Sequence, residues 1–217
     1  TRLTNILNMK NVPNILTILR IILIPIIVAS FYFHGFVSNV IVAFLFALAS
    51  VTDFFDGYLA RYFKVQSAFG KCLDPIADKL LVILTIVMLV NFSNGNLIIL
   101  IPGLIIIARE ILVSGFREFL ANYNIKMPVS NLAKIKTAIQ MTAITLLLLG
   151  ENGSDYVIDE LSLMIGEEVY VSTKDMMINY VVIIGGVLFS LASFLTIVTG
   201  YIYLKLVVQH IRKINVG

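Results

Sequence analysis

The chain has 217 residues, of which 59% are hydrophobic and only 13% are charged, and its formal net charge is +3. A soluble domain contains about 25% charged residues, so this composition excludes an ordinary soluble protein and indicates an integral membrane protein. The single cysteine, Cys72, excludes an internal disulfide, and two histidines without a cysteine cluster argue against a zinc site.

The first residues precede the apolar part of the chain. Residues 1–12 carry Arg2 and Lys10 among apolar residues that recur at helical spacing. This pattern predicts a short amphipathic juxtamembrane helix that lies on the membrane surface. A frayed terminus explains the segment equally well.

Polar residues mark one face of the first apolar run. Asn14, Thr17 and Arg20 recur on the same side of its first turns. Polar groups at membrane depth normally face the interior of a helix bundle, so we expect these side chains to meet the cavity of four aspartates described below rather than lipid. For Asn14, a role as a helix cap is an equally good interpretation.

The rest of the chain continues as apolar runs separated by polar turns. Crossing a bilayer requires about 20 residues, and the runs predict an all-α, polytopic membrane protein with six transmembrane helices in a single domain over residues 1–217. The expected spans are roughly 15–33, 37–60, 72–92, 97–120, 132–150 and 178–208. The last run is longer than a bilayer needs, so its end is expected to project beyond the lipid.

The distribution of positive charge predicts the orientation in the membrane. An even number of spans puts both termini on one side, together with the connectors 61–71 and 121–136. That side holds nearly all of the cations that lie near span ends, namely Arg2, Lys10, Arg61, Lys64, Lys71, Lys126, Lys134, Lys136, Lys205, Arg212 and Lys213. The opposite loops hold only Lys174, so the termini are expected in the cytoplasm. The acidic loop 151–177 on the other side is interpreted as a solvated loop without a site.

Four aspartates stand in apolar surroundings around the turn between the second and third runs. Asp53 and Asp56 are three residues apart, and Asp74 and Asp78 are four apart, so each pair lies on one helical face. A charge at membrane depth costs about 2.5–3.5 kcal/mol, which a divalent cation would offset. Carboxylate oxygens without sulfur or imidazole suit Mg²⁺ or Mn²⁺, held together with substrate phosphates, as one or two ions.

The spacing of these residues resembles a known signature. The chain is similar here to the signature of the CDP-alcohol phosphotransferases. In that signature the fixed residues and the gaps between them are Asp, two residues, Asp-Gly, two residues, Ala-Arg, eight residues, Gly, three residues, Asp, three residues and Asp. The matching positions are Asp53, Asp56, Gly57, Ala60, Arg61, Gly70, Asp74 and Asp78. The resemblance implies that Asp53, Asp56 and Asp74 bind metal, and that Asp78, beside the metal, acts as general base toward the acceptor alcohol.

The small residues of the motif fit a bound nucleotide. Gly57 and Ala60 have almost no side chain, so a base and ribose can approach the helix backbone, and Arg61 supplies a cation beside the phosphates. Tight packing of helices explains the small residues equally well from spacing alone, and the resemblance favours the nucleotide. The residues expected to bind CDP-diacylglycerol are Asn14, Thr17, Asp56, Gly57, Ala60, Arg61, Ser67 and Gly70.

A second polar group predicts the acceptor. Arg109 and Arg117 are two turns apart on the fourth run, and Lys134 and Lys136 begin the fifth. Cations inside a bundle beside a metal-phosphate site favour a second anion, and a phosphate fits them. Pairing of each arginine with the following glutamate is expected to be poor, because adjacent residues diverge by about 100° on a helix. Lys136 lies about 200° around the helix from Lys134.

The sequence around these cations is also similar to the branch of the family that makes phosphatidylglycerophosphate. The resemblance therefore implies transfer of a phosphatidyl group from CDP-diacylglycerol to sn-glycerol 3-phosphate, with release of CMP. It also implies a homodimer in a bacterial inner or plasma membrane, with its active site facing the cytoplasm. The alternative is the same chemistry with inositol phosphate or another alcohol as acceptor. A divalent-cation transporter is the alternative of another class, although Arg61 and Arg109 would repel its cargo.

Overall fold

A computed structural model of the chain describes residues 17–33, 36–63, 68–93, 95–123, 125, 130–150 and 173–216. Within these ranges, the side chains of residues 36, 53–63, 68–72, 173–179 and 212–216 are not described. The predicted amphipathic segment 1–12, Asn14, Ser67 and most of the acidic loop lie outside the described residues.

The regular structure of the described residues is entirely helical. Its six helices are Thr17–Ser30, α2 (Phe36–Phe63), α3 (Ala68–Phe92), α4 (Leu97–Asn122), α5 (Asn131–Gly150) and α7 (Thr173–Val216). Each helix coincides with one predicted apolar run, so the prediction of an all-α fold is confirmed. The largest difference is α7, which begins before the predicted residue 178 and ends after residue 208.

The number of membrane spans is confirmed only in part. Among the described residues, three helices are long and apolar enough to cross a membrane, namely Leu97–Asn122, Asn131–Gly150 and Tyr180–Ile211. Two further apolar helices, Thr17–Ser30 and Val37–Thr52, are shorter. The described part therefore contains fewer full-length apolar helices than the six that the sequence predicts.

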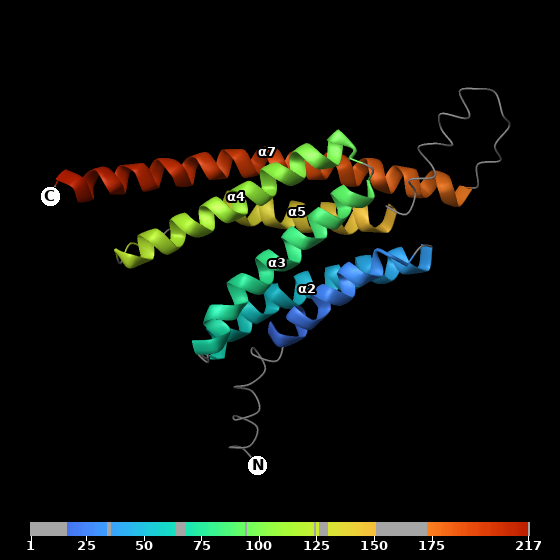
Figure 1. Cartoon of the computed structure of the whole chain (residues 1–217), viewed down its shortest axis with the longest axis horizontal. Helices are drawn as coiled ribbons and strands as arrows, with labels where there is room; N and C mark the ends of the chain where they lie inside the picture. The colour runs from blue at the N-terminus through green and yellow to red at the C-terminus, as the bar shows by residue number, and fades with distance from the viewer. Residues whose placement is uncertain are drawn as a thin grey trace, which may run out of the picture.

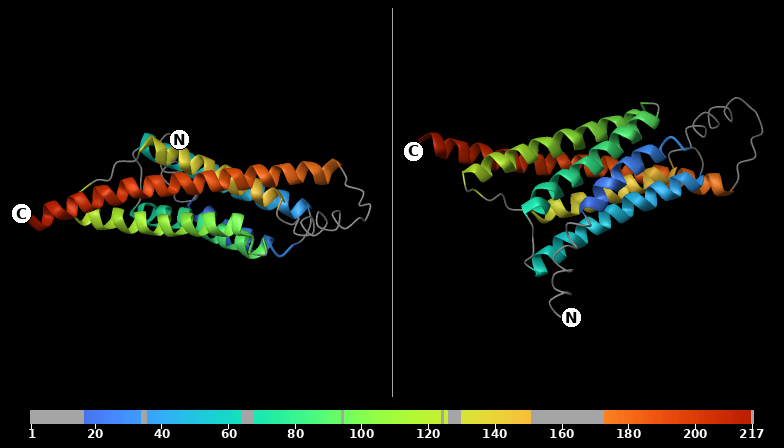
Figure 2. Two further views of the ribbon diagram at one scale, coloured as in Figure 1. Left: turned by 90° about the horizontal axis from the view of Figure 1, so that it is seen from above. Right: turned by 60° about the horizontal axis from the view of Figure 1, so that its bottom comes forward.

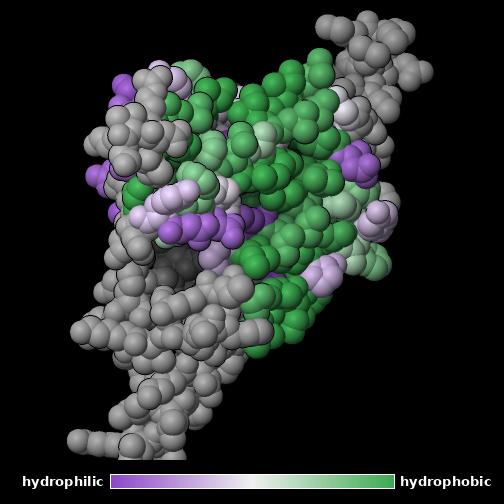
Figure 3. Space-filling view, turned by 60° about the vertical axis from the view of Figure 1, so that its left-hand side comes forward, coloured by the Kyte–Doolittle hydropathy of each residue, from purple (hydrophilic) through white to green (hydrophobic). Residues whose placement is uncertain are grey.

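The surface of the described helices is apolar outside as well as inside. Large hydrophobic side chains such as Leu104 on α4 and Phe194 on α7 are 57% and 62% exposed. The face shown in Figure 3 is mostly hydrophobic where its residues are described, with hydrophilic residues gathered in a band across it. A soluble protein rarely exposes such a continuous apolar surface. The chain is an integral membrane protein, as its composition predicts.

The long helix α7 lies along the bundle and packs against both α4 and α5 (Figures 1 and 2). The helix α5 also packs against α2, and α3 contacts α4 and α5. Fully buried side chains fill the space between these helices, including Phe46 of α2, Ile86 of α3, Ile144 of α5 and Phe189 of α7. The core thus reaches across the whole bundle.

A glycine sets the closest approach of α5 and α7. A methyl group added at Gly185 of α7 would lie 3.1 Å from Cγ of Leu147 and 3.2 Å from Cβ of Leu146. Small residues of this kind allow the backbones of membrane helices to come close, so that van der Waals contacts hold them together.

Candidate active site

The first described helix contacts the aspartates of α3. The hydroxyl of Thr17 donates a hydrogen bond to Oδ1 of Asp74, and Nη1 of Arg20 donates one to Oδ1 of Asp78 at 2.6 Å. The side chain of Arg20 is only 1% exposed. The prediction that the polar face of this helix meets the aspartates is therefore confirmed for Thr17 and Arg20.

The other motif residues lie on α2 and α3, on either side of residues 64–67, which are outside the described part of the chain. Asp53, Asp56, Gly57, Ala60 and Arg61 belong to the C-terminal part of α2, and Gly70 belongs to the first turns of α3. Their side chains are outside the described part of the structure, so a site made by all four aspartates stays a prediction.

Only two carboxylates of the aspartate site are described, and no group of three or more aspartate, glutamate, histidine or cysteine side chains that could hold a metal ion occurs among the described residues, so a metal at this site stays a prediction. Asp74 and Asp78 lie one turn apart on α3, and the residues that contact them, Thr17 and Arg20, donate hydrogen bonds to one oxygen of each. Carboxylate and hydroxyl oxygens are ligands that Mg²⁺ and Mn²⁺ accept.

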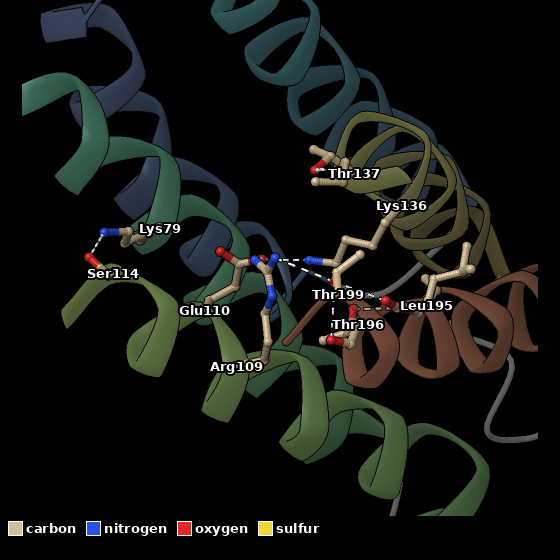
Figure 4. A network of polar contacts seen from close by, with 11 residues as sticks. Lys79, Arg109, Glu110, Ser114, Lys136, Thr137, Leu195, Thr196 and Thr199 are labelled. Atoms are coloured by element: carbon tan, nitrogen blue, oxygen red, sulfur yellow. Dashed lines mark hydrogen bonds and ion pairs between the residues drawn. The ribbon is translucent and has the colours of Figure 1, made fainter. Parts of the chain in front are cut away.

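Two cations contact one carboxylate further along the bundle, and a third cation, on another helix, lies nearby (Figure 4). Nζ of Lys136 on α5 lies 2.5 Å from Oε1 of Glu110 on α4, and Nη1 of Arg109 lies 3.3 Å from the same oxygen. Lys79 on α3 donates a hydrogen bond to the Ser114 hydroxyl and interacts electrostatically with Glu110. We call Lys79, Arg109, Glu110 and Lys136 the cationic cluster.

The cluster is buried and carries more positive than negative charge. The side chains of Lys136 and Arg109 are 1% and 14% exposed, and that of Glu110 is 23% exposed. Nε of Arg109 is buried and has no hydrogen-bond partner among the described residues. Buried donors are normally satisfied, so this unpaired donor is unusual, and an anion at the cluster stays a prediction.

The contact between Arg109 and Glu110 corrects one sequence prediction. The angle between adjacent helical residues argued against their pairing, yet their side chains lie 3.3 Å apart. The arginine side chain is long enough to reach across the diverging directions, and Lys136 fixes Glu110 from the opposite helix. The pairing that was discounted is therefore part of the site.

The four predicted acceptor cations are divided into two groups. Arg109 and Lys136 meet at Glu110, whereas Arg117 and Lys134 are exposed in the described structure. The angle of about 200° between Lys134 and Lys136 explains their different burial, because α5 packs one face against α7 and α2. The sequence identified all four cations but not this division.

Several residues of the site were not predicted. Arg20 was expected to face the aspartates but not to bind one, and Lys79, Ser114, Thr199 and Tyr203 were not singled out. A lysine or an arginine at membrane depth is a signal in the sequence, because such residues are rare and functional there. Ser114, Thr199 and Tyr203 carry no comparable signal, since their role depends on which helices pack together.

The geometry agrees with a comparison of the sequence with known families. Residues 10–198 match the CDP-alcohol phosphatidyltransferase family. The chain belongs to this family. The match includes both helices of the aspartate motif and all residues of the cationic cluster.

Relatives of the chain carry two different enzyme names. The chain is 45% identical over 182 residues to a CDP-diacylglycerol–glycerol-3-phosphate 3-phosphatidyltransferase of Rickettsia bellii, covering 84% of this chain and 87% of that one. A protein of the same name from Rickettsia typhi is 46% identical, with 84% and 88% covered. A cardiolipin synthase (CMP-forming) of Oryza sativa is 39% identical over 142 residues, which are 60% of this chain and 43% of that protein.

Proposed function

We propose that this CDP-alcohol phosphatidyltransferase transfers a phosphatidyl group from CDP-diacylglycerol to sn-glycerol 3-phosphate and releases CMP. The observation that carries the proposal is the cationic cluster, in which Arg109 and Lys136 are buried around a single carboxylate oxygen. Such an excess of buried positive charge suits a phosphate on the acceptor. The names of the two Rickettsia relatives support the same acceptor.

The aspartate motif is the proposed donor site. Asp53, Asp56, Asp74 and Asp78 would hold one or two Mg²⁺ or Mn²⁺ ions, which when bound neutralise the charge that develops on the departing nucleotide. The residues proposed to bind CDP-diacylglycerol are Asn14, Thr17, Asp56, Gly57, Ala60, Arg61, Ser67 and Gly70. The contact between Thr17 and Asp74 supports this assignment, because it joins the first helix to the motif.

Asp78 is the proposed general base. It takes the proton from the acceptor hydroxyl while that oxygen attacks the phosphorus that carries the diacylglycerol. The new oxygen–phosphorus bond forms as the bond to CMP breaks, and the electron pair of the broken bond leaves with CMP. The hydrogen bond from Arg20 holds the carboxylate of Asp78 in place for this role.

The cationic cluster is the proposed acceptor site. Arg109 and Lys136 would bind the phosphate of glycerol 3-phosphate directly, while Arg117 and Lys134, being exposed, would attract it at the entrance. Asp78 and Lys79 are adjacent on α3, and Lys79 reaches Ser114 of α4 beside the cluster. The sequence of α3 therefore joins the proposed base to the proposed acceptor site.

The proposed placement in the membrane follows the predicted topology. Six helices cross the bilayer, both termini lie in the cytoplasm, and the aspartates lie near the cytoplasmic interface, where soluble glycerol 3-phosphate arrives. The C-terminal ends of α2, α4 and α7 and the N-terminal end of α3 lie toward the same end of the bundle, at the left of Figure 1, which agrees with this placement. By analogy with the family, the enzyme is proposed to be a homodimer in a bacterial inner or plasma membrane.

The test is release of CMP by the purified protein in mixed micelles. We expect CMP only when CDP-diacylglycerol, Mg²⁺ or Mn²⁺ and an acceptor are all supplied, and none in excess chelator. A panel of acceptors identifies the substrate, and glycerol 3-phosphate is expected to be far better than inositol phosphate or phosphatidylglycerol. CMP release that does not depend on glycerol 3-phosphate, or full activity in chelator, would refute the assignment.

A further inference from the structure

The side chain of Arg109 lies against three residues of α7. Nη2 of Arg109 lies 3.4 Å from the hydroxyl of Thr199, and Cζ lies 5.5 Å from the centre of the Tyr203 ring. Between them, a methyl group added at Gly200 would lie 3.3 Å from Cγ of Arg109. Thr199, Gly200 and Tyr203 follow the residues 10–198 that match the family.

These three residues have complementary effects on the arginine. Thr199 and Tyr203 are 1% and 2% exposed, so their contacts with Arg109 are shielded from water. A cation above an aromatic ring is attracted to its face, and the attraction increases when water is excluded. The absent side chain of Gly200 leaves room for the stem of Arg109 to lie against α7.

We propose that Thr199, Gly200 and Tyr203 form a cradle on α7 that positions Arg109 for the acceptor phosphate. The cradle holds the guanidinium from one side while Glu110 holds it from another, at 3.3 Å. The arginine is thereby fixed before the acceptor arrives, so less of its conformational freedom is lost on binding. The inference rests on the proposed function, because it assigns positioning residues to the proposed acceptor site.

The proposed positioning of Arg109 depends on the ring of Tyr203 and not on its hydroxyl. The hydroxyl is buried and has no hydrogen-bond partner among the described residues. A phenylalanine would therefore keep the surface that faces Arg109, whereas a leucine of similar apolar character would remove it. This difference provides a matched pair of variants at one position.

The experiment measures the apparent KM for glycerol 3-phosphate, the KM for CDP-diacylglycerol and kcat for each variant in mixed micelles. Tyr203→Leu is expected to raise the KM for glycerol 3-phosphate by about 2- to 30-fold, with the other KM little changed. Tyr203→Phe should keep both values near those of the parent. Leu204→Ala, at a 44% exposed neighbour on α7, controls for any change in this part of the helix.

A double mutant separates positioning from an independent contact. If Tyr203 acts through Arg109, Tyr203→Leu should have no further effect on the KM for glycerol 3-phosphate in an Arg109→Ala background. An equal increase in both backgrounds would overturn the proposal, and so would an equal increase for Tyr203→Phe and Tyr203→Leu.

Gly200→Ala and Thr199→Val keep the test valid if Tyr203→Leu does not fold. Each perturbs the cradle with little change in volume, and each is expected to raise the same KM selectively. Unchanged KM values for both would refute the cradle. If Arg109→Ala leaves the KM for glycerol 3-phosphate unchanged, the proposed acceptor site is wrong. If Arg109→Ala raises this KM but the variants at Thr199, Gly200 and Tyr203 do not, only the cradle is rejected.

Discussion

A single oxygen atom of Glu110 holds together cations from two helices. Both Lys136 and Arg109 contact Oε1, so this carboxylate offsets the repulsion between them. A buried cation that lost this partner would be costly, by several kcal/mol. The carboxylate therefore allows two positive charges to lie side by side inside the bundle.

Substitution of the four predicted acceptor cations should give a graded result. Lys136→Met and Arg109→Ala each remove a charge-assisted contact of about 1.5–3 kcal/mol, so the KM for glycerol 3-phosphate should rise about 10- to 150-fold. Lys134→Ala and Arg117→Ala should have smaller effects, because these side chains are exposed and screened by salt. Initial rates against each substrate at fixed Mg²⁺ measure the effects, and equal losses at all four positions would contradict the division by burial.

Asp78→Asn tests the general base. Loss of a general base typically lowers turnover by about 10²- to 10⁴-fold, and we expect this loss with CDP-diacylglycerol binding largely intact. Asparagine keeps an oxygen that can accept the hydrogen bond from Arg20, so the packing around it should be preserved. The measurement combines kcat with equilibrium binding of CDP-diacylglycerol. Lost binding with normal residual chemistry would make Asp78 a ligand only.

The sequence predicts single residues well when their chemistry is unusual for their surroundings. Arg20 and Arg109 stand out because charges are rare at membrane depth, and both are found in polar contacts. The sequence does not predict that Lys136 is buried and Lys134 is exposed, because their burial depends on which face of α5 packs against α7. The partner of a long side chain is equally hard to infer, as the contact between Arg109 and Glu110 shows.

At the level of helices, the contact between α5 and α7 depends on Gly185. Gly185→Ala places a methyl group 3.2 Å from Cβ of Leu146, which cannot move without the backbone, so we expect a loss of about 1–3 kcal/mol in stability. The measurement is thermal unfolding in detergent.

The neighbouring glycine provides the control for this prediction. A methyl group at Gly186 would meet only Cγ2 of Ile98, at 3.8 Å, which is an ordinary contact. Because alanine favours a helix over glycine by about 1 kcal/mol, Gly186→Ala should be neutral or stabilising. Equal destabilisation by both variants would show that the close approach at Gly185 is not what holds the two helices.

Helix positions follow from the sequence more closely than helix lengths do. The apolar run 97–120 predicts α4, which ends at Asn122, and the run 132–150 predicts α5, which begins at Asn131. In α7 the helix continues into polar residues at both ends, up to Thr173 and Val216. Hydropathy identifies the apolar residues that can face lipid. A helix continues beyond those residues until a residue that ends a helix, such as glycine or proline, follows.

For the whole molecule, the proposed topology can be tested with a thiol reagent that does not cross membranes. In a Cys72→Ser background, Ser154→Cys in the acidic loop should be labelled on intact cells, and Lys213→Cys near the end of α7 only after permeabilisation. The result expected for six spans has the two positions on opposite sides of the membrane. Labelling of Lys213→Cys on intact cells would contradict the cytoplasmic placement of the C-terminus.

The architecture as a whole is only partly contained in the sequence pattern. Composition and the aspartate spacing predict a helical membrane enzyme of this family, which the structure and the relatives support. The packing order is not predictable in the same way, because apolar faces toward lipid and toward protein look alike in a membrane chain. Phe189 and Phe194 of α7 are both phenylalanines, yet one is fully buried and the other is 62% exposed.

The length of α7 links the acceptor site to the thickness of the bilayer. Its 44 residues extend about 66 Å, more than twice the hydrocarbon core of about 30 Å, so the helix must tilt, project or do both. A thinner or thicker membrane changes the tilt that a long helix adopts. Because Thr199 and Tyr203 of α7 contact Arg109 of α4, we expect a change in the tilt of α7 to alter the position of this arginine, so that lipid composition would affect the proposed acceptor site.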